Sequence, residues 1–328
     1  MADDFDVIVA GGGIGGLTAA LHSARAGRTT LVLGGRAPGG LLLSIETIEG
    51  VPGFPEGIPG YDLCPMLQEQ AEEAGAEVRM EELAGLAPVD DGWRVTIADG
   101  EPELEARAVI LATGARLKHL GVPGEEALQG RGVSHCASCD APLLRDRVVA
   151  VVGGGDSALQ EALTLADSVA EVIVLHRGAE LDGQATYVRR ALEHPKITMR
   201  CRTVVEEILG DEKVAGVRAR DLASDNVEEL ELGGVFVYVG LQPNSEFLQG
   251  SLDVDDDGLI TTDATMHTEL PGLLAAGIVR RGSLGQAAIS AGEGANAAKA
   301  AHRYLQTGGW AQTPPAASAT IGNGGPHG

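Results

Sequence analysis

The sequence is poor in aromatic and basic residues, and each shortage narrows what the protein can be. Phe, Trp and Tyr make up 3% of its 328 residues, and 24 Lys and Arg stand against 47 Asp and Glu, which gives a net charge of −23. Because phosphate backbones are bound by clustered Lys and Arg, we expect no nucleic-acid partner. No apolar run is long enough to cross a bilayer, so we expect no membrane partner either.

Cysteine is also scarce, with four residues in the chain. The N-terminal stretch MADDFDVIVAGGG has neither a basic segment nor a small-residue cleavage site, so we expect a cytoplasmic protein. Thiols are kept reduced there, and a close cysteine pair is more often redox-active or metal-binding than a structural staple. Cys64 and Cys201 stand alone, and we interpret each as a small buried apolar residue.

Glycine, in contrast, is abundant, and two glycine turns share one pattern. Residues 4–35 predict a short strand, a turn with Gly11, Gly13 and Gly16, a helix and a second strand. This is the context that a dinucleotide-binding G-x-G-x-x-G requires. One such turn is weak evidence in a chain with 47 glycines.

A second copy strengthens the interpretation. Residues 146–177 repeat the pattern, with Gly153, Gly155 and Ala158 between a predicted strand and helix, and a strand that ends at His176 and Arg177. Two such units in 328 residues predict two nucleotide-binding folds, each with a helix N-terminus that faces a pyrophosphate.

Further segments belong to the same α/β pattern. We expect an apolar strand in 106–117 that ends in Ala112-Thr113-Gly114, and a strand, a glycine loop and a long Ala-rich helix in 270–306. The stretch 308–328 is rich in Gly, Pro, Ser and Ala and predicts a flexible tail. The alternative is that Trp310 or His327 of this stretch folds back and covers a nucleotide cofactor bound to one of these folds.

The stretch SHCASCDAP, residues 134–142, holds two of the four cysteines as Cys136-x-x-Cys139. Taken alone, the pair could be a metal clip, a structural disulfide or an electron relay. Its position between the two predicted nucleotide folds favours the relay.

Taken together, these pieces resemble the low-molecular-weight thioredoxin reductases, from about residue 4 to residue 306. The matching segments are GGGIGGLTAA, PGGLL, ETIEGVPGFP, ATGA, HCASCD, VVGGGDSALQEA and QAAISAGEGANAA. The resemblance implies two Rossmann-like, three-layer ββα domains, the second inserted into the first. An FAD domain would comprise 1–117 and 244–328, and an inserted NAD(P)H-type domain 118–243.

The resemblance also implies site residues. FAD would lie against Gly11, Gly13, Ile14, Gly16, Gly39, Gly40, Leu41, Ala112, Thr113, Gly114, Gly277, Ile278, Gln286 and Ala287. A nicotinamide nucleotide, NADPH or NADH, would lie against Gly153, Gly155, Asp156, Ser157, His176 and Arg177.

For the cysteine pair, the resemblance implies that Cys139 faces the flavin, that Cys136 attacks the partner's disulfide and that Asp140 moves the proton. It also implies a thioredoxin-like partner and a homodimer. No metal is expected: four ligands are needed for structural zinc, no second C-x-x-C follows, and His135 cannot easily complete a tetrahedron with both cysteines. His135 could tune the pair or simply face solvent.

The chain departs from the family pattern at two places. Ile278 stands where the family has an Asp on the ribityl chain of FAD, and Gly285 replaces an Arg before Gln286. After the second strand of the inserted unit, Gly178 and Asp182 stand where NADPH-specific members have arginines. Guanidinium groups suit a 2′-phosphate and carboxylates repel it, so the donor could be NADPH, NADH or ferredoxin.

We therefore expect an FAD-dependent enzyme that passes electrons to Cys136–Cys139 and on to a thioredoxin-type disulfide. Two alternatives stay open. One is an FAD-dependent dithiol oxidase that uses oxygen, which resembles enzymes of natural-product pathways with the same architecture. The other is a non-catalytic flavin redox regulator.

Overall fold

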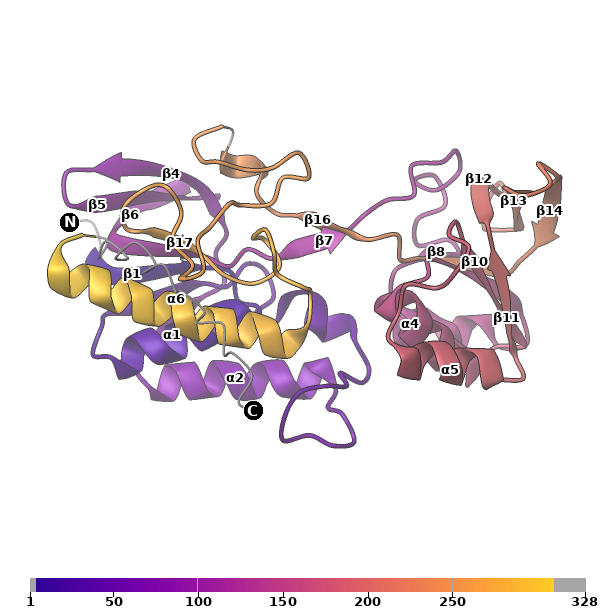
Figure 1. Ribbon diagram of the computed structural model, residues 1–328, viewed down its shortest axis with the longest axis horizontal. Coiled ribbons are helices and arrows are strands. Elements are labelled where there is room, and N and C mark those ends of the chain that lie inside the picture. Colours follow the sequence, from indigo (N-terminus) through magenta and orange to yellow (C-terminus); the bar gives the residue numbers. More distant parts are fainter. Residues whose placement is uncertain (1–3, 99, 249, 310–328) are drawn as a thin grey trace, which may run out of the picture.

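A computed structural model describes residues 4–98, 100–248 and 250–309. The predicted tail, with Trp310 and His327, lies outside these residues. In Figure 1 two bodies are joined by a thin two-stranded ribbon: a larger sheet-and-helix unit that contains both ends of the described chain, and a smaller unit built from its middle.

The larger unit is built on a mixed sheet in the order β3-β2-β1-β6-β5-β4, with β17 also paired to β6. β1, β2, β3, β6 and β17 run parallel, whereas β4 and β5 are antiparallel to their neighbours. The strands are β1 (Asp4–Ala10), β2 (Thr30–Leu33), β3 (Glu77–Arg79), β4 (Leu83–Val89), β5 (Gly92–Ile97), β6 (Gly100–Leu111) and β17 (Leu273–Ala275).

Both faces of this sheet are buried, which is why its central strands read as continuous apolar runs. Val7 and Val9 of β1 face one core and Ile8 and Ala10 the other, because successive side chains of a strand point to opposite faces. Three helices pack together on one face (Figure 1). They are α1 (Ile14–Arg25), α2 (Gly60–Glu73) and α6 (Ala287–Thr307), and the short 3-10 helices η1 (Gly40–Ser44) and η3 (Glu246–Leu248) complete the unit.

The smaller unit has a five-stranded parallel sheet in the order β11-β10-β9-β15-β8 and a separate antiparallel sheet, β12-β13-β14. Its own cores lie on both faces of the parallel sheet. The strands are β8 (Val133–Ser134), β9 (Val148–Val152), β10 (Glu171–His176), β11 (Ile197–Cys201), β12 (Thr203–Leu209), β13 (Gly216–Asp221), β14 (Val227–Glu231) and β15 (Gly234–Val237). The helices are α3 (Ala137–Asp140), α4 (Asp156–Ala166), α5 (Ala185–Glu193) and the 3-10 helix η2 (Ala141–Leu144).

The connecting ribbon consists of β7 (Ala115–Leu117) and β16 (Leu241–Pro243), which pair antiparallel. The chain leaves the larger unit along β7 and returns along β16. The α/β class and both strand-turn-helix-strand units are thus confirmed. The ends of β7 and β16 fall at residues 117 and 243, and we propose the division 1–117 plus 244–328 and 118–243 on this basis.

Among the described residues, no helix combines the length and the apolar composition that a membrane crossing requires. Of the two lone cysteines, Cys64 is buried as predicted, while Cys201 is only half buried.

The α1–α6 contact supplies a stability prediction. A Cβ at Gly294 of α6 would overlap the carbonyl oxygen of Gly15 in α1, so Gly294→Ala should force the two helices apart. Overpacking of this kind costs about 1–3 kcal/mol. In the same helix, a Cβ at the exposed Gly292 has nothing within 4 Å, and Gly292→Ala should stabilise by up to about 1 kcal/mol. Urea midpoints of the two variants should therefore shift in opposite directions, and a downward shift in both would contradict the packing.

Candidate active site

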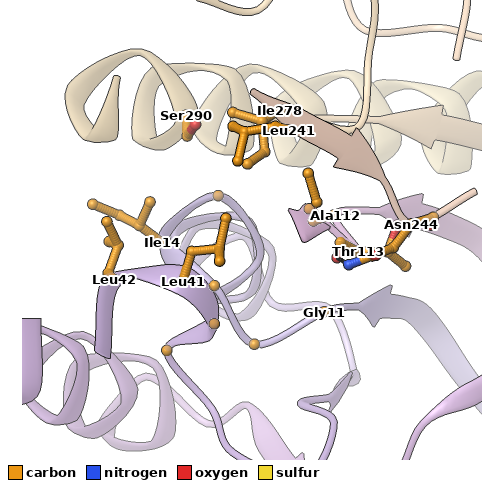
Figure 2. A pocket seen from close by; sticks show the side chains of 18 of the residues that line it. Gly11, Ile14, Leu41, Leu42, Ala112, Thr113, Leu241, Asn244, Ile278 and Ser290 are labelled. Atoms are coloured by element: carbon orange, nitrogen blue, oxygen red, sulfur yellow. Dashed lines mark hydrogen bonds between the residues drawn. The ribbon is translucent and has the colours of Figure 1, made fainter. Parts of the chain in front are cut away.

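A cavity of about 640 Å³ opens at the carboxyl ends of the first sheet's parallel strands, the edge at which open α/β sheets bind ligands. It extends from the turn before α1, past η1, to the start of α6 (Figure 2). Residues of the smaller unit, including His135, Ser157 and Glu161, close part of its wall. The cavity is therefore built by both units.

The backbone of the first glycine turn lines the cavity directly, because its glycines have no side chains that would stand in between. Gly11 has φ +119°, and a Cβ there would overlap the carbonyl oxygen of Ala112. A Cβ at Gly16 would overlap the oxygen of Gly11, which fixes how closely α1 approaches β1. The N–H groups at the start of α1 consequently face the cavity, as a pyrophosphate site requires.

Most of the predicted flavin residues line this one cavity. They are Gly11, Gly13, Ile14, Gly39, Gly40, Leu41, Ala112, Thr113, Gly114, Gly277, Ile278, Gln286 and Ala287. Gly16 instead lies behind the turn, in the contact just described. The structure thus brings together segments that are up to 276 residues apart, from Gly11 to Ala287.

Asn244 is a cavity residue that sequence reasoning missed. It follows β16, its side-chain amide donates to the Thr113 carbonyl oxygen at 2.9 Å, and the Thr113 hydroxyl donates to the Asn244 carbonyl oxygen at 2.7 Å. This reciprocal pair fastens the returning strand to the end of β6. No local signal could have found it, because the partners are 131 residues apart.

A buried ion pair stands behind the loop that contains Ile278. One oxygen of Glu293 accepts the Gly277 N–H at 2.8 Å, and the other lies 2.6 Å from the Arg280 guanidinium. Both side chains are about 10% exposed. This pair holds the loop in place while Ile278 itself presents an aliphatic side chain to the cavity (Figure 2).

The second glycine turn begins α4. A Cβ at Gly153 would overlap the Tyr238 carbonyl oxygen, so this turn also requires glycine at its first position. The Asp156 carboxylate accepts hydrogen bonds from the Gln184 N–H at 2.6 Å and from the Gln286 amide at 3.0 Å. The predicted flavin residue Gln286 is therefore bonded to a predicted nicotinamide residue of the other unit.

The end of β10 is acidic. His176 is buried, and its Nε2 lies 3.7 Å from the exposed carboxylate of Asp182. Arg177 and Glu180 are exposed beside them. The stretch after β10 thus has two exposed carboxylates, Glu180 and Asp182, and one exposed guanidinium, Arg177.

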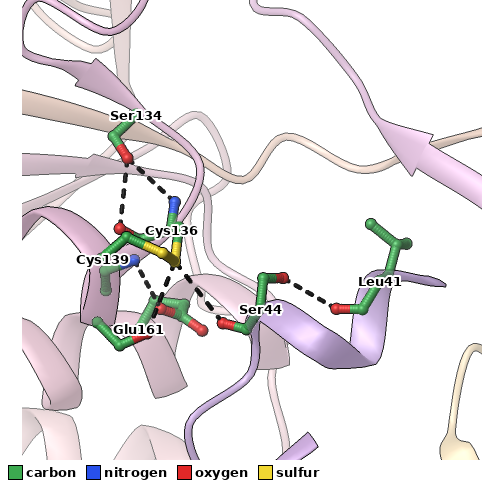
Figure 3. The surroundings of a disulfide bond; sticks show 8 residues. Leu41, Ser44, Ser134, Cys136, Cys139 and Glu161 are labelled. Atoms are coloured by element: carbon green, nitrogen blue, oxygen red, sulfur yellow. Dashed lines mark hydrogen bonds between the residues drawn. A yellow bond between two sulfur atoms is a disulfide. The ribbon is translucent and has the colours of Figure 1, made fainter. Parts of the chain in front are cut away.

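Cys136 and Cys139 form a disulfide at the start of α3, with their Cα atoms 5.4 Å apart. The Cys136 Sγ lies 3.9 Å from the Ser44 carbonyl oxygen of η1, the 3-10 helix that lines the cavity (Figure 3). Cys136 is half buried and Cys139 is exposed. The Cys136 end of the disulfide therefore lies against η1, whereas Cys139, which we predicted to face the flavin, is exposed. Neither cysteine is among the residues that line the cavity, and the half-buried Asp140 directly follows Cys139.

A buried carboxylate accepts a hydrogen bond from the backbone of the disulfide loop. Glu161 of α4 is 7% exposed, and its Oε2 accepts the N–H of Ala137, the residue after Cys136, at 3.2 Å (Figure 3). Burial is the main reason that the pKa of Glu161 rises to about 7; the Ala137 N–H opposes the shift and the charge of Glu46 adds to it. The Tyr238 hydroxyl is buried nearby, and its pKa is raised by burial and then by the Glu161 charge.

Among the described residues, several polar contacts join the two units, including an ion pair between Lys118 and Asp257 at 3.9 Å. Arg190 of α5 pairs with Glu49 at 2.8 Å, Gln286 bonds Asp156, and the Gln160 amide donates to the Thr47 carbonyl oxygen. The Arg190–Glu49 pair is partly exposed, so it contributes at most about 1 kcal/mol.

With the geometry established, the comparisons with known proteins identify the family. Residues 5–294 match the model of the pyridine nucleotide-disulphide oxidoreductases. The chain is 42% identical over 301 residues to the thioredoxin reductase of Mycolicibacterium smegmatis, which covers 92% of this chain and 96% of that one.

This chain belongs to the low-molecular-weight thioredoxin reductase family. Two solved structures of the family have the same architecture. That of Lactococcus lactis thioredoxin reductase in its FR conformation has a TM-score of 0.89 at 36% identity, over 92% of this chain and 99% of that chain. That of the T. acidophilum thioredoxin reductase has a TM-score of 0.87 at 32% identity, over 92% and 98%. The chain is thus an FAD-dependent disulfide oxidoreductase.

The cavity of this family member fits FAD. Gly11 leaves no room for a side chain, the start of α1 offers N–H groups to a pyrophosphate, and the apolar wall with Ile14, Leu41 and Leu42 suits a flat aromatic ring system. Bound there, FAD would supply two-electron chemistry between a donor and the disulfide. Ile278 offers no acceptor to a ribityl hydroxyl, and the polar side chains that line the same cavity include Asn244, Gln286 and Ser290.

The shifted pKa of Glu161 predicts a pH effect on stability. Because the pKa of Glu161 is higher in the folded chain than the usual glutamate pKa of 4.5, the unfolded chain binds fewer protons between pH 4.5 and about 7. Stability is therefore lost as the pH rises through this window, by up to about 3 kcal/mol.

Glu161→Gln keeps an oxygen for the Ala137 N–H but cannot ionise, so it should flatten this slope. Thermal midpoints of the variant, the native chain and the surface control Glu212→Gln at pH 5 and pH 8 provide the measurement. Parallel profiles for Glu161→Gln and the native chain would show that the carboxyl does not titrate in this range.

Proposed function

We propose that this chain reduces the disulfide of a thioredoxin-type protein, with Cys136–Cys139 as the relay between the flavin site and the partner. The observation that supports this most directly is the position of the disulfide, with the Cys136 sulfur 3.9 Å from the cavity-lining helix η1. A structural staple has no need to lie at such a wall. The two cysteines are three residues apart in a Cys-x-x-Cys motif, which is the spacing of many exchangeable disulfides.

The exchange itself requires only the two thiols. After two-electron reduction of the pair, the Cys136 thiolate attacks the partner's disulfide, forms a mixed disulfide and releases one partner thiolate. The Cys139 thiolate then attacks Cys136, which re-forms the intramolecular disulfide and releases the second partner thiolate. Asp140, half buried next to Cys139, is placed to take and return the proton.

Cys136 is half buried and its sulfur lies against Ser44, so access of a partner protein to it is restricted in this arrangement. We therefore infer that the smaller unit moves on β7 and β16 between a position in which the pair meets the cavity and one in which the pair meets the partner. The few polar contacts that hold the units together would break in that motion. Because the chain resembles other thioredoxin reductases, we propose a thioredoxin-type partner and pairing of two chains as well.

Loss of either cysteine should separate the two halves of the reaction. In Cys136→Ser the donor should still bleach the bound flavin, whereas reduction of thioredoxin should fall to the uncatalysed background. The matched control is Cys201→Ser, which removes a free, half-buried thiol and should leave turnover unchanged. Thioredoxin reduction by Cys136→Ser at the native rate would exclude the relay, and no turnover by the native chain would favour the regulator.

For the donor, we propose NADH over NADPH. Glu180 and Asp182 are exposed beside Arg177, and Asp182 lies 3.7 Å from the His176 ring. A 2′-phosphate placed there meets two carboxylates and one guanidinium, whereas the hydroxyls of NADH meet acceptors. Reduced ferredoxin needs no ribose pocket and is the alternative donor.

Anaerobic stopped-flow reduction with NADH, NADPH, reduced ferredoxin and a small dithiol tests this choice. We expect NADH to be at least about tenfold more efficient than NADPH, which corresponds to about 1.4 kcal/mol. Asp182→Arg should reverse the preference, while the same charge change at an exposed loop site, Glu212→Arg, should not. Faster reduction by NADPH than by NADH in the native chain would contradict the proposal, and bleaching by the small dithiol alone would favour a dithiol oxidase.

A further inference from the structure

Three ligand-type side chains meet where the chain leaves the connecting ribbon. His119 and Glu125 belong to the segment after β7, and His135 belongs to the loop that precedes the redox pair. One nitrogen of each histidine and one carboxylate oxygen all lie within 4.8 Å of one another. None of the three has been given a catalytic role above, but His135 also lines the flavin cavity.

Glu125 is fixed in place by the backbone around it. Its side chain is 4% exposed, and its two oxygens accept the N–H groups of Leu120 at 2.8 Å and Gly121 at 2.7 Å. A Cβ at the preceding Gly124, which has φ +89°, would overlap the Ile208 carbonyl oxygen. Each carboxylate oxygen retains a lone pair, so a buried and oriented anionic ligand is present before any ion binds.

His135 has the hydrogen bond that metal-binding histidines usually make. Its Nδ1 lies 2.9 Å from the Val237 carbonyl oxygen at the end of β15. Because a carbonyl only accepts, Nδ1 holds the proton and Nε2 holds the lone pair. A backbone carbonyl on the far nitrogen of the ring is the common outer partner of a histidine ligand.

His119 is the adjustable member of the group. Its side chain is 62% exposed, its Nδ1 lies 3.6 Å from a Glu125 oxygen, and its ring meets that of His135 edge to face with the centroids 6.0 Å apart. Zinc–nitrogen bonds of about 2.0–2.1 Å in a tetrahedron place ligand atoms roughly 3.3 Å apart. Because His119 is exposed, rotation of its side chain can bring its nitrogen from 3.6 Å to this distance from the Glu125 oxygen without moving Glu125.

We propose that His119, Glu125 and His135 form a binding site for a Zn²⁺-type divalent cation, with the fourth position open to water. Two imidazoles and one carboxylate are a ligand set that zinc accepts. The ion offsets the buried Glu125 charge. It also joins the exit of the ribbon to the residue before Cys136, and so adds positive charge next to the redox pair.

The test uses the flavin-loaded protein after a chelator has removed any metal. The disulfide is kept intact, so that Cys136 and Cys139 offer no thiolate to the ion. Calorimetric titration with Zn²⁺ should give one ion per chain. His119→Gln and His135→Gln should each weaken binding by at least about tenfold, since even outer-shell changes cost that much. His22→Gln, at an exposed histidine of α1, should bind as the native chain does.

Co²⁺ in place of Zn²⁺ gives a second readout, because a four-coordinate nitrogen and oxygen site has visible absorption that the His119 and His135 variants should lose. The flavin spectrum serves as the check that each variant is folded. Absence of stoichiometric uptake at micromolar Zn²⁺ would reduce the cluster to a His–Glu ion pair and overturn the proposal. Uptake that survives both histidine variants, or that disappears in Cys201→Ser, would overturn it as well.

Discussion

The smaller unit is inserted into the larger one through two short strands, β7 and β16, and this connection constrains everything the site can do. A relay that must meet both a buried flavin and another protein cannot sit rigidly in either place. The disulfide belongs to a separately packed unit, which is connected to the larger unit by a two-stranded ribbon and a small number of polar contacts (Figure 1). Residues of both units complete the cavity wall.

Three loops of the functional region are each bound by a buried carboxylate that accepts backbone N–H groups. Glu161 binds the N–H of Ala137 in the redox loop, Glu293 binds that of Gly277 in the flavin loop, and Glu125 binds those of Leu120 and Gly121 after the ribbon. A buried carboxylate is costly unless its oxygens are paired, so each one fixes its loop strongly. For Glu161 the cost remains visible in a pKa near 7.

The sequence revealed those parts of the site that depend on local spacing. Both glycine turns and the Cys136–Cys139 pair have patterns within a few residues, and the strands and helices around them were predicted in the correct order. Asn244, Glu161 and the Glu49–Arg190 pair escaped notice because their partners are 24 to 141 residues away. The His119–Glu125–His135 cluster has no metal-ligand spacing either, since only the return of β15 brings His135 into position.

The residues that depart from the family pattern lie at the positions that the sequence comparison assigned to them. Ile278 lines the cavity and Asp182 lies at the end of β10, so both substitutions act at the sites where their chemistry would matter. The fold is therefore that of the family, while we propose that a few side chains at the nucleotide site are enough to change the preferred electron donor.

The central claim is that flavin and disulfide form one electron path, and an anaerobic reductive titration of the oxidised holoprotein tests it most directly. With dithionite, followed by flavin absorbance, we predict uptake of about four electrons per chain, two at the flavin and two at the disulfide, and only about two in Cys136→Ser. Complete reduction of the native chain with two electrons, and no thiol gained, would contradict the account.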